Sequence, residues 1–254
     1  MTFDDARTLA ADVWAMPRPL LLALDVDGVL SPIVSHATAA RLSPGVAEAL
    51  SALASRRDID VALVSGRSLD GLRQFDLDPA IIVVGSHGAE VRGDPPPMMT
   101  EAQSRLLTRL TELACRAADQ AGDGAWVELK PISVVLHVRQ AAPESGSHAR
   151  DALLRAAAEI DDTTVKPGKA VVELMARPAD KGRALGALRE RTAPRAAVFA
   201  GDDMTDEDAF RVLEEGDLGV KVGVGDTHAT RRLPDPDAVR AWLDALVGIA
   251  RSEE

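Results

Sequence analysis

The sequence contains little cysteine and no long apolar run. Cys115 is the single cysteine among 254 residues, so the chain cannot form an internal disulfide, and its place in a helical pattern predicts a small core residue. No stretch of about 18 uncharged apolar residues occurs, and the acidic segment 1–14 lacks the apolar centre of a signal peptide. We therefore expect no membrane partner and a cytoplasmic location.

Basic residues are also in deficit. Lysine and arginine total 29 against 40 aspartates and glutamates, a formal net charge of −11 that disfavours nucleic acid as a partner. Any phosphate group that the chain binds must therefore meet a local cluster of cations. The hydrophobic content of 46% is nevertheless sufficient for a buried core in one large domain or two small ones.

Short apolar runs alternate with helical patterns towards both ends of the chain. Segments 19–25, 59–65, 80–85 and 195–202 are bounded by turn residues, which is typical of buried strands. One intervening helix is expected to start with Ser43 as its N-cap and Pro44 at its first position. The repeated order of strand and helix predicts an α/β fold with a parallel sheet covered on both faces.

The middle of the chain has a different pattern. After the proline-rich segment 93–99, residues 103–120 place apolar side chains on one helical stripe, and "AWVELK" and "SVVLHV" then alternate as antiparallel strands do. A helix over about residues 147–160 and a strand over residues 169–175 follow. We expect a core of residues 1–95 and 178–254, with residues 96–177 as an inserted α+β domain.

Polar residues follow each expected strand of the core. They are Asp25 and Asp27 after the first strand, Ser65, Gly66 and Arg67 after the second, and the acidic stretch 201–210 after the last, with Lys181 opening a helix just before it. Because ligands of open α/β sheets bind beyond the carboxyl ends of the strands, these groups are expected to converge at one edge.

Such a set of groups suits metal-assisted phosphoryl transfer. Carboxylates are preferred ligands of Mg²⁺, and an aspartate can attack phosphorus to form an aspartyl phosphate. In this interpretation Asp202 binds Mg²⁺, while Asp203 and Asp206 lie behind it and position its water shell. Ser65 and Lys181 would balance the charge of the transferred group.

Each of these residues also has an ordinary structural interpretation. The pair Asp25 and Asp27 could form a strand-to-loop turn, the acidic stretch could be a solvated helix start, and Ser65 could be a cap. The joint occurrence of all four groups in this order favours catalysis.

The same residues resemble the four signatures of the haloacid dehalogenase superfamily of phosphatases. These are "DVDGVL", "SGR", Lys181 and "GDDMTD", in that order. Within that superfamily the chain resembles the trehalose-6-phosphate phosphatases through "GSHGAE" (85–90), "GKAVVEL" (168–174), "DKG" (180–182) and the polar series Glu128, Lys130, Ser133, His137 and Arg139. The match extends to "VKVG" and "LPDPDAVRAWL" near the C-terminal end.

The resemblance implies a haloacid dehalogenase-like Rossmannoid core with a cap domain that selects the substrate. Asp25 would be the nucleophile and Asp27 the general acid and then base, with Mg²⁺ held by Asp25, the Asp27 carbonyl and Asp202. The substrate would be trehalose 6-phosphate, with a trehalose-phosphate synthase as a functional partner. The expected substrate-binding residues are Gly66, Arg67, His87, Glu128, Lys130, His137, Arg139 and Glu173.

Several alternatives stay open at this point. The substrate could be sucrose phosphate or mannosyl-phosphoglycerate, or the chain could be a non-catalytic sugar-phosphate sensor. The polar residues of the insert could form only the solvated face of a sheet, and His87 could be a core-edge histidine. The chain also departs from the family pattern, because Val29 stands where threonine is more common and Met175 where a basic residue is common, with Arg177 two positions later.

Overall fold

The computed structural model describes residues 2–34, 37–168 and 170–253, and these form two units. The core unit comprises Met1–Asp94 and Asp180–Glu254, and the inserted unit comprises Pro95–Ala179. Among the described residues, none of the helices has the length and apolar character needed to cross a membrane.

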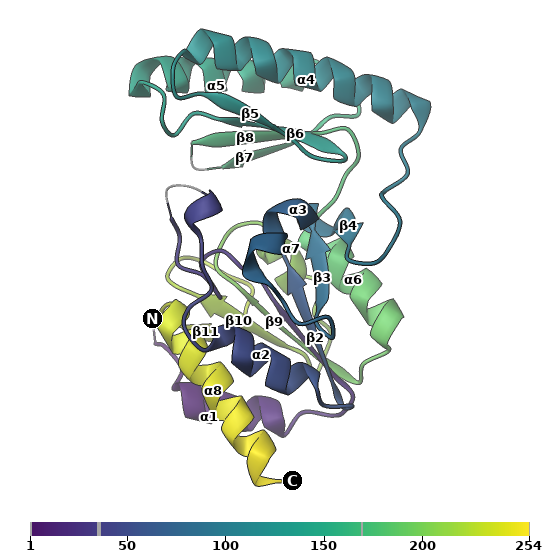
Figure 1. Ribbon diagram of the computed structural model, residues 1–254, viewed down its shortest axis with the longest axis vertical. Helices are drawn as coiled ribbons and strands as arrows, with labels where there is room; N and C mark the ends of the chain where they lie inside the picture. The colour runs from purple at the N-terminus through teal and green to yellow at the C-terminus, as the bar shows by residue number, and fades with distance from the viewer. Residues whose placement is uncertain (1, 35–36, 169, 254) are drawn as a thin grey trace. The chain divides into compact units, whose positions relative to one another are not determined.

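A seven-stranded sheet lies at the centre of the core unit (Figure 1). Its order is β11-β10-β9-β1-β2-β3-β4, and every neighbouring pair is parallel except β3 with β4. The strands are β1 (Leu20–Leu24), β2 (Ile59–Val64), β3 (Ile82–Gly85), β4 (Glu90–Val91), β9 (Ala196–Gly201), β10 (Leu218–Val222) and β11 (Arg231–Leu233). The predicted α/β class is confirmed, and the four predicted core strands correspond to β1, β2, β3 and β9.

Helices cover both faces of this sheet, because alternate side chains of each strand point to opposite faces (Figure 1). Leu20, Leu22 and Leu24 pack into the cluster formed with α1, α2 and α8, whereas Leu21 and Ala23 pack with α6 and α7. The helices are α1 (Ala6–Trp14), α2 (Val46–Ala54), α3 (Leu69–Leu72), α6 (Lys181–Thr192), α7 (Glu207–Phe210) and α8 (Pro236–Ser252), with 3-10 turns at Ala37–Ala39, Arg73–Phe75 and Ser86–Gly88.

The predicted start of α2 is wrong. Gly45, and not Ser43, is the N-cap, and its φ of 85° lies in the left-handed region that glycine adopts without steric cost. This left-handed conformation turns the chain before the helix begins, so Pro44 precedes the N-cap and lies outside α2. Ser43 is buried, and its carbonyl accepts a hydrogen bond from the Val46 N–H at 3.1 Å.

The inserted unit is a four-stranded antiparallel sheet with two helices on one face (Figure 1). The strand order is β5-β6-β8-β7, and the elements are α4 (Glu101–Ala121), β5 (Trp126–Leu129), β6 (Ser133–His137), α5 (Pro143–Ala158), β7 (Thr164–Gly168) and β8 (Val171–Met175). Val134, Leu136 and Leu174 point towards the helices. The sequence did not predict β7, which contains Pro167 and no clear alternation. Residue 169 of the predicted strand 169–175 lies outside the described residues.

Cys115 is not the core residue that the sequence predicts. It is exposed on α4, whose buried stripe runs through Leu110, Ala114, Ala117 and Ala121. Cysteine at position 115 follows directly after a stripe position, so the 3.6-residue period of the helix turns it to the outer face.

Candidate active site

The central strands of the core sheet bring the predicted residues to one edge. Strand β1 lies between β9 and β2, with Leu24 opposite both Ala200 and Leu63. Asp25 continues this register by donating its N–H to the Ala200 carbonyl at 2.9 Å. The side chains that follow three neighbouring parallel strands therefore gather around the end of β1, as the sequence predicts.

Lys181 is the cation at this edge. It is the first residue of α6 and is 1% exposed, and its Nζ lies 2.9 Å from Asp25 Oδ1 and 2.7 Å from Asp206 Oδ1. The next residue, Gly182, has no room for a side chain, because a Cβ there would lie 2.5 Å from the Asp208 carbonyl oxygen. The start of α6 can therefore approach the acidic stretch closely enough for Lys181 to bridge two carboxylates.

The acidic stretch 201–210 folds around Asp206. This side chain is fully buried, and its Oδ2 accepts the backbone N–H groups of Asp202 at 2.8 Å and Asp203 at 2.9 Å. Asp203 in turn accepts the Thr205 N–H and hydroxyl, each at 2.7 Å. Residues 202–206 thus form a hydrogen-bonded loop around a buried carboxylate. The stretch then opens α7, with Glu207 and Asp208 in its first turn, so it is also a helix start, but Asp206 and Glu207 are buried and not solvated.

Burial and mutual repulsion raise the pKa of three carboxyls in this cluster, those of Asp25, Asp202 and Asp206. Burial, only partly opposed by Lys181 and reinforced by Asp206 and Asp202, holds the pKa of Asp25 well above its usual range. Burial, with the charges of Asp206 and Asp203, raises the pKa of Asp202 to about 7. Burial alone would lower the pKa of Lys181, but Asp206 and Asp25 overcome it and raise that pKa, so the lysine stays charged.

The excess of negative charge fits a divalent cation. Asp25, Asp202 and Asp206 each offer a carboxylate oxygen, and these oxygens lie within 4.8 Å of one another. Asp206 already accepts Lys181 and two N–H groups, which leaves Asp25 and Asp202 as the better direct ligands. Gly28, with φ of 81°, lets Asp202 approach the β1 loop, since a Cβ there would lie 2.1 Å from Asp202 Oδ2. A hard cation bound by oxygen ligands suits this donor set.

Asp27 and Arg67 form a forked ion pair. Arg67 Nε donates to Asp27 Oδ2 and its Nη2 donates to Oδ1, each at 2.6 Å. The pair joins the loop after β1 to the loop after β2. In the second loop, buried Ser65 accepts the Arg67 N–H on its hydroxyl at 3.2 Å.

His87 packs over the loop after β2. A Cβ at Gly66 would lie 2.7 Å from the His87 ring, so glycine is needed for this close approach. Ser86 and His87 both have positive φ, 49° and 57°, and their N–H groups donate to the Arg67 and Ser65 carbonyls. The structure thus places His87, 8% exposed, against the predicted phosphate-binding loop.

The polar residues of the inserted unit form two connected groups on one face of its sheet. Glu173 Oε1 accepts Ser133 Oγ at 2.6 Å and Lys130 Nζ at 3.2 Å. His137 Nε2 lies 2.9 Å from Glu128 Oε2, and its ring stacks on exposed Trp126 at 3.9 Å between centroids.

These two groups are organised and not merely solvated. The side chains of Lys130 and Glu173 are 7% and 8% exposed. Burial tends to raise the pKa of Glu128, but the hydrogen bond from His137 and the charge of Lys130 lower it overall. Arg139 is exposed just beyond the end of β6.

The structure also places the residues where the chain departs from the family pattern. Val29 is fully buried in the cluster with α1, α2 and α8, where a methyl group substitutes for the threonine hydroxyl. Met175 is fully buried, and Arg177 donates to the Met98 carbonyl at 3.2 Å within the inserted unit.

Lys221 lies in the matched segment "VKVG" but was not among the predicted site residues. This residue of β10 is 5% exposed and donates from its Nζ to the Asp202 carbonyl, and the same Nζ lies 4.0 Å from Glu207. The sequence feature that could have identified Lys221 is its position between the apolar residues Val220 and Val222, which are both buried. A charged group in an apolar strand needs a buried partner.

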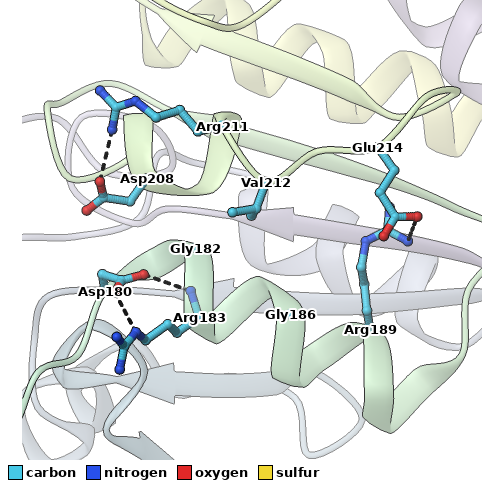
Figure 2. Close-up of a pocket in the computed structure, with 9 residues that line it drawn as sticks. All are labelled: Asp180, Gly182, Arg183, Gly186, Arg189, Asp208, Arg211, Val212 and Glu214. Carbon is cyan, nitrogen blue, oxygen red and sulfur yellow. Dashed lines mark hydrogen bonds and ion pairs between the residues drawn. The ribbon is translucent and has the colours of Figure 1, made fainter.

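A separate groove of about 580 Å³ lies between α6 and α7 (Figure 2). Each arginine that lines it is paired with an acid: Arg183 with Asp180, Arg189 with Glu214, and Arg211 with Asp208. The positive charges of the groove are therefore already matched. We assign the chemistry to the buried cluster around Asp25, which lies outside the lining of this groove.

Comparisons with known proteins identify the family that the chain resembles. A family model described as Trehalose-phosphatase matches residues 23–236. The trehalose-6-phosphate phosphatase of Escherichia coli is 32% identical over 230 residues, covering 87% of this chain and 84% of that protein. The solved structure of a trehalose-6-phosphate phosphatase related protein has a TM-score of 0.75 and 27% identity, covering 92% of this chain and 100% of that one.

A longer relative shows the same similarity. An uncharacterized glycosyl hydrolase of Mycobacterium tuberculosis is 37% identical over 247 residues, which is 90% of this chain and 18% of that protein. The chain thus spans less than a fifth of the length of that relative.

Proposed function

The chain belongs to the trehalose-phosphatase family, and from this premise we propose that it hydrolyses trehalose 6-phosphate to trehalose and inorganic phosphate. The observation that carries the proposal is the buried contact of Asp25 with Lys181 at the carboxyl end of β1, beside Asp202. A nucleophilic carboxylate, a fixed cation and a metal-binding carboxylate are the groups that hydrolysis of a phosphomonoester through an aspartyl phosphate uses.

In the first step, Asp25 attacks phosphorus through a carboxylate oxygen. The bond between phosphorus and the sugar oxygen breaks, and Asp27 gives its proton to that oxygen, so the sugar leaves as a neutral alcohol. The phosphoryl group is now an ester of Asp25. Lys181, 2.9 Å from Asp25, offsets negative charge on the transferred group throughout the step.

In the second step, water attacks the phosphorus of the aspartyl phosphate. Asp27, now a carboxylate, accepts a proton from that water, and the bond between phosphorus and the Asp25 oxygen breaks. Inorganic phosphate leaves and Asp25 is regenerated. Asp25 and Asp27 thus return to their starting states after each turnover. The reaction consumes one water molecule for each ester that is hydrolysed.

Asp25, Asp202 and the Asp27 backbone carbonyl are the groups that would hold Mg²⁺. When bound, Mg²⁺ supplies positive charge next to the phosphate oxygens and offsets the repulsion that raises the pKa of Asp202. Asp203 and Asp206 fix the backbone of the loop that carries Asp202, so its carboxylate is oriented before a ligand arrives.

The inserted unit supplies the groups that would recognise the non-reacting sugar. Glu128, Lys130, His137 and Glu173 offer carboxylate, ammonium and imidazole partners for hydroxyl groups on one sheet face, beside the flat ring of Trp126. His87, Gly66 and Arg139 are the further predicted substrate contacts. A trehalose-phosphate synthase would be the functional partner that supplies the substrate.

A phosphate-release screen tests this function. The purified chain with Mg²⁺ is assayed against trehalose 6-phosphate, sucrose phosphate, mannosyl-phosphoglycerate and glucose 6-phosphate, with Asp25→Asn as the control for contaminating phosphatases. We expect the highest kcat/KM with trehalose 6-phosphate. A clear preference for another ester would reassign the substrate, and no release from any ester would favour a sensor.

A further inference from the structure

We propose that Arg67 is a positioning residue that holds the carboxyl of Asp27 in the orientation needed for proton transfer. The inference rests on the proposed function, because it takes Asp27 as the general acid and base. It differs from the role that the family resemblance implies for Arg67, which is direct contact with the substrate.

The geometry of the pair is the first observation. Nε and Nη2 of one guanidinium donate to the two oxygens of one carboxylate, both at 2.6 Å. A bidentate pair of this kind fixes the plane of the carboxylate as well as its position, which a single hydrogen bond does not do. Each carboxylate oxygen has about two lone-pair sites, so one N–H bond per oxygen leaves a site for the transferred proton.

Arg67 is itself held firmly. Its backbone N–H donates to Ser65 Oγ at 3.2 Å, and its carbonyl accepts the Ser86 N–H at 2.7 Å. The guanidinium carbon lies 5.5 Å from the centre of the Phe75 ring, and Phe75 belongs to the main hydrophobic cluster of the core unit. The side chain of Arg67 is 12% exposed. It can therefore act as a rigid support.

Asp27 needs such a support more than Asp25 does. The side chain of Asp27 is 36% exposed, whereas that of Asp25 is 5% exposed and is fixed by Lys181. Asp27 also precedes Gly28, whose φ of 81° marks a sharp turn in the loop. A general acid is effective only when its proton is within hydrogen-bonding reach of the leaving oxygen, and small displacements of such groups are costly.

The leaving group of the substrate separates positioning of Asp27 from binding of phosphate. A poor leaving group, such as the sugar oxygen of trehalose 6-phosphate, needs the proton, whereas p-nitrophenolate leaves without it. Wild type, Arg67→Gln and Arg67→Lys are compared on substituted phenyl phosphates that range from p-nitrophenyl to phenyl phosphate, and on trehalose 6-phosphate. Arg73→Gln, which removes an exposed arginine nearby, is the matched control.

We expect kcat/KM of Arg67→Gln to depend more steeply on the leaving group than that of wild type. The loss should be about 10- to 10²-fold on phenyl phosphate and trehalose 6-phosphate, a part of the contribution of general acid catalysis, and about twofold or less on p-nitrophenyl phosphate. Arg67→Lys keeps the charge but lacks the fork, so it should not restore the wild-type dependence. Arg73→Gln should match wild type.

Two other results would overturn the proposal. An equal loss of kcat/KM on all esters would mean that Arg67 binds the phosphate directly. Values of kcat/KM equal to those of wild type on every ester would mean that the ion pair of Arg67 with Asp27 does not contribute to catalysis. Asp27→Asn serves as the internal reference and should show the steepest dependence. If Asp27→Asn keeps the wild-type dependence, the assignment of Asp27 fails and the Arg67 proposal fails with it, whereas a wild type without phosphatase activity would reject the proposed function itself.

Discussion

Asp25 is the residue on which the proposed chemistry depends most. Its carboxylate is buried, faces Lys181 and lies near three other carboxylates. Such a repulsive arrangement costs folding stability and is typical of a reacting group. Asp25→Asn removes the nucleophile while retaining its shape. We expect phosphate release to fall on the order of 10³-fold or more, with an unchanged circular dichroism spectrum.

The same substitution has a matched control. Asp226→Asn changes an exposed aspartate of the core unit and should leave phosphate release unchanged. Turnover near the wild-type rate in Asp25→Asn would reject the nucleophile assignment, and a comparable loss in both variants would point to a nonspecific effect of charge.

The raised pKa of Asp202 predicts that the affinity for a metal ion depends on pH. The pKa of Asp202 in the folded chain is raised to about 7, above the ordinary aspartate value of 3.8, so between these values the folded state without metal keeps a proton that the unfolded state has released. This group therefore contributes stability below pH 3.8, and that contribution is lost as the pH rises through about 7. Mg²⁺ competes with that proton, so its affinity should increase over the same range.

Thermal unfolding measures this effect. The increase in Tm caused by Mg²⁺ should be larger at about pH 8 than at about pH 6, because at the lower pH the metal must displace the proton. In Asp202→Asn the increase should be small at both pH values. Equal increases in the wild type at the two pH values would contradict the assignment of Asp202 as a ligand.

At the scale of elements, β10 supports the loop that follows β9. Lys221 donates to the Asp202 carbonyl from a strand that pairs with β9, so it ties the loop of the proposed metal ligand Asp202 to the sheet. Lys221→Met keeps the length of the side chain but removes the donor. We expect Mg²⁺ to bind on the order of 10-fold more weakly in calorimetry, in line with the loss of one charged hydrogen bond. Unchanged affinity would show that the loop holds its shape without Lys221.

The arrangement of the core elements was largely predictable from the sequence. Buried parallel strands appear as short apolar runs, and polar residues at their ends predict the edge where a site forms. The start of α2 was not predictable, because it depends on the left-handed conformation of Gly45 and not on the preference of Ser43 for caps. Strand β7 was missed because pairing with β8 overrides its weak pattern.

The candidate site was predictable in its members but not in its contacts. Asp25, Asp202 and Lys181 could be named from their places at the ends of elements. The fork between Asp27 and Arg67 joins residues 40 positions apart in the sequence, and the support of Asp202 by Lys221 joins residues 19 apart. Such pairs depend on the orientation of side chains in three dimensions, which periodicity does not determine.

At the scale of the whole molecule, the proposed chemistry and the proposed sugar recognition belong to different units. The core unit holds the groups proposed to react, whereas the polar face of the inserted unit holds Lys130 and Glu173. Binding of a remote sugar can be used to align the phosphate, so losing it lowers kcat/KM for the whole substrate only. Lys130→Ala should lose about 10- to 10³-fold on trehalose 6-phosphate and little on p-nitrophenyl phosphate.

Arg155→Ala, an exposed change on α5, is the control within the inserted unit and should leave both activities unchanged. An equal loss on both esters in Lys130→Ala would mean that Lys130 supports the fold or the core chemistry. No loss on either ester would mean that the polar face does not recognise the sugar.

Trapping of the phosphorylated enzyme is the most direct test of the central claim that Asp25 carries the phosphoryl group. In the proposed mechanism Asp27→Asn should slow hydrolysis of the intermediate, whereas p-nitrophenyl phosphate does not need the missing proton to form it. After mixing with Mg²⁺ and this ester, acid quenching and peptide mass spectrometry should find one phosphoryl group on Asp25. Phosphate on Ser65 or another residue, or an unmodified chain that still turns over, would contradict the account.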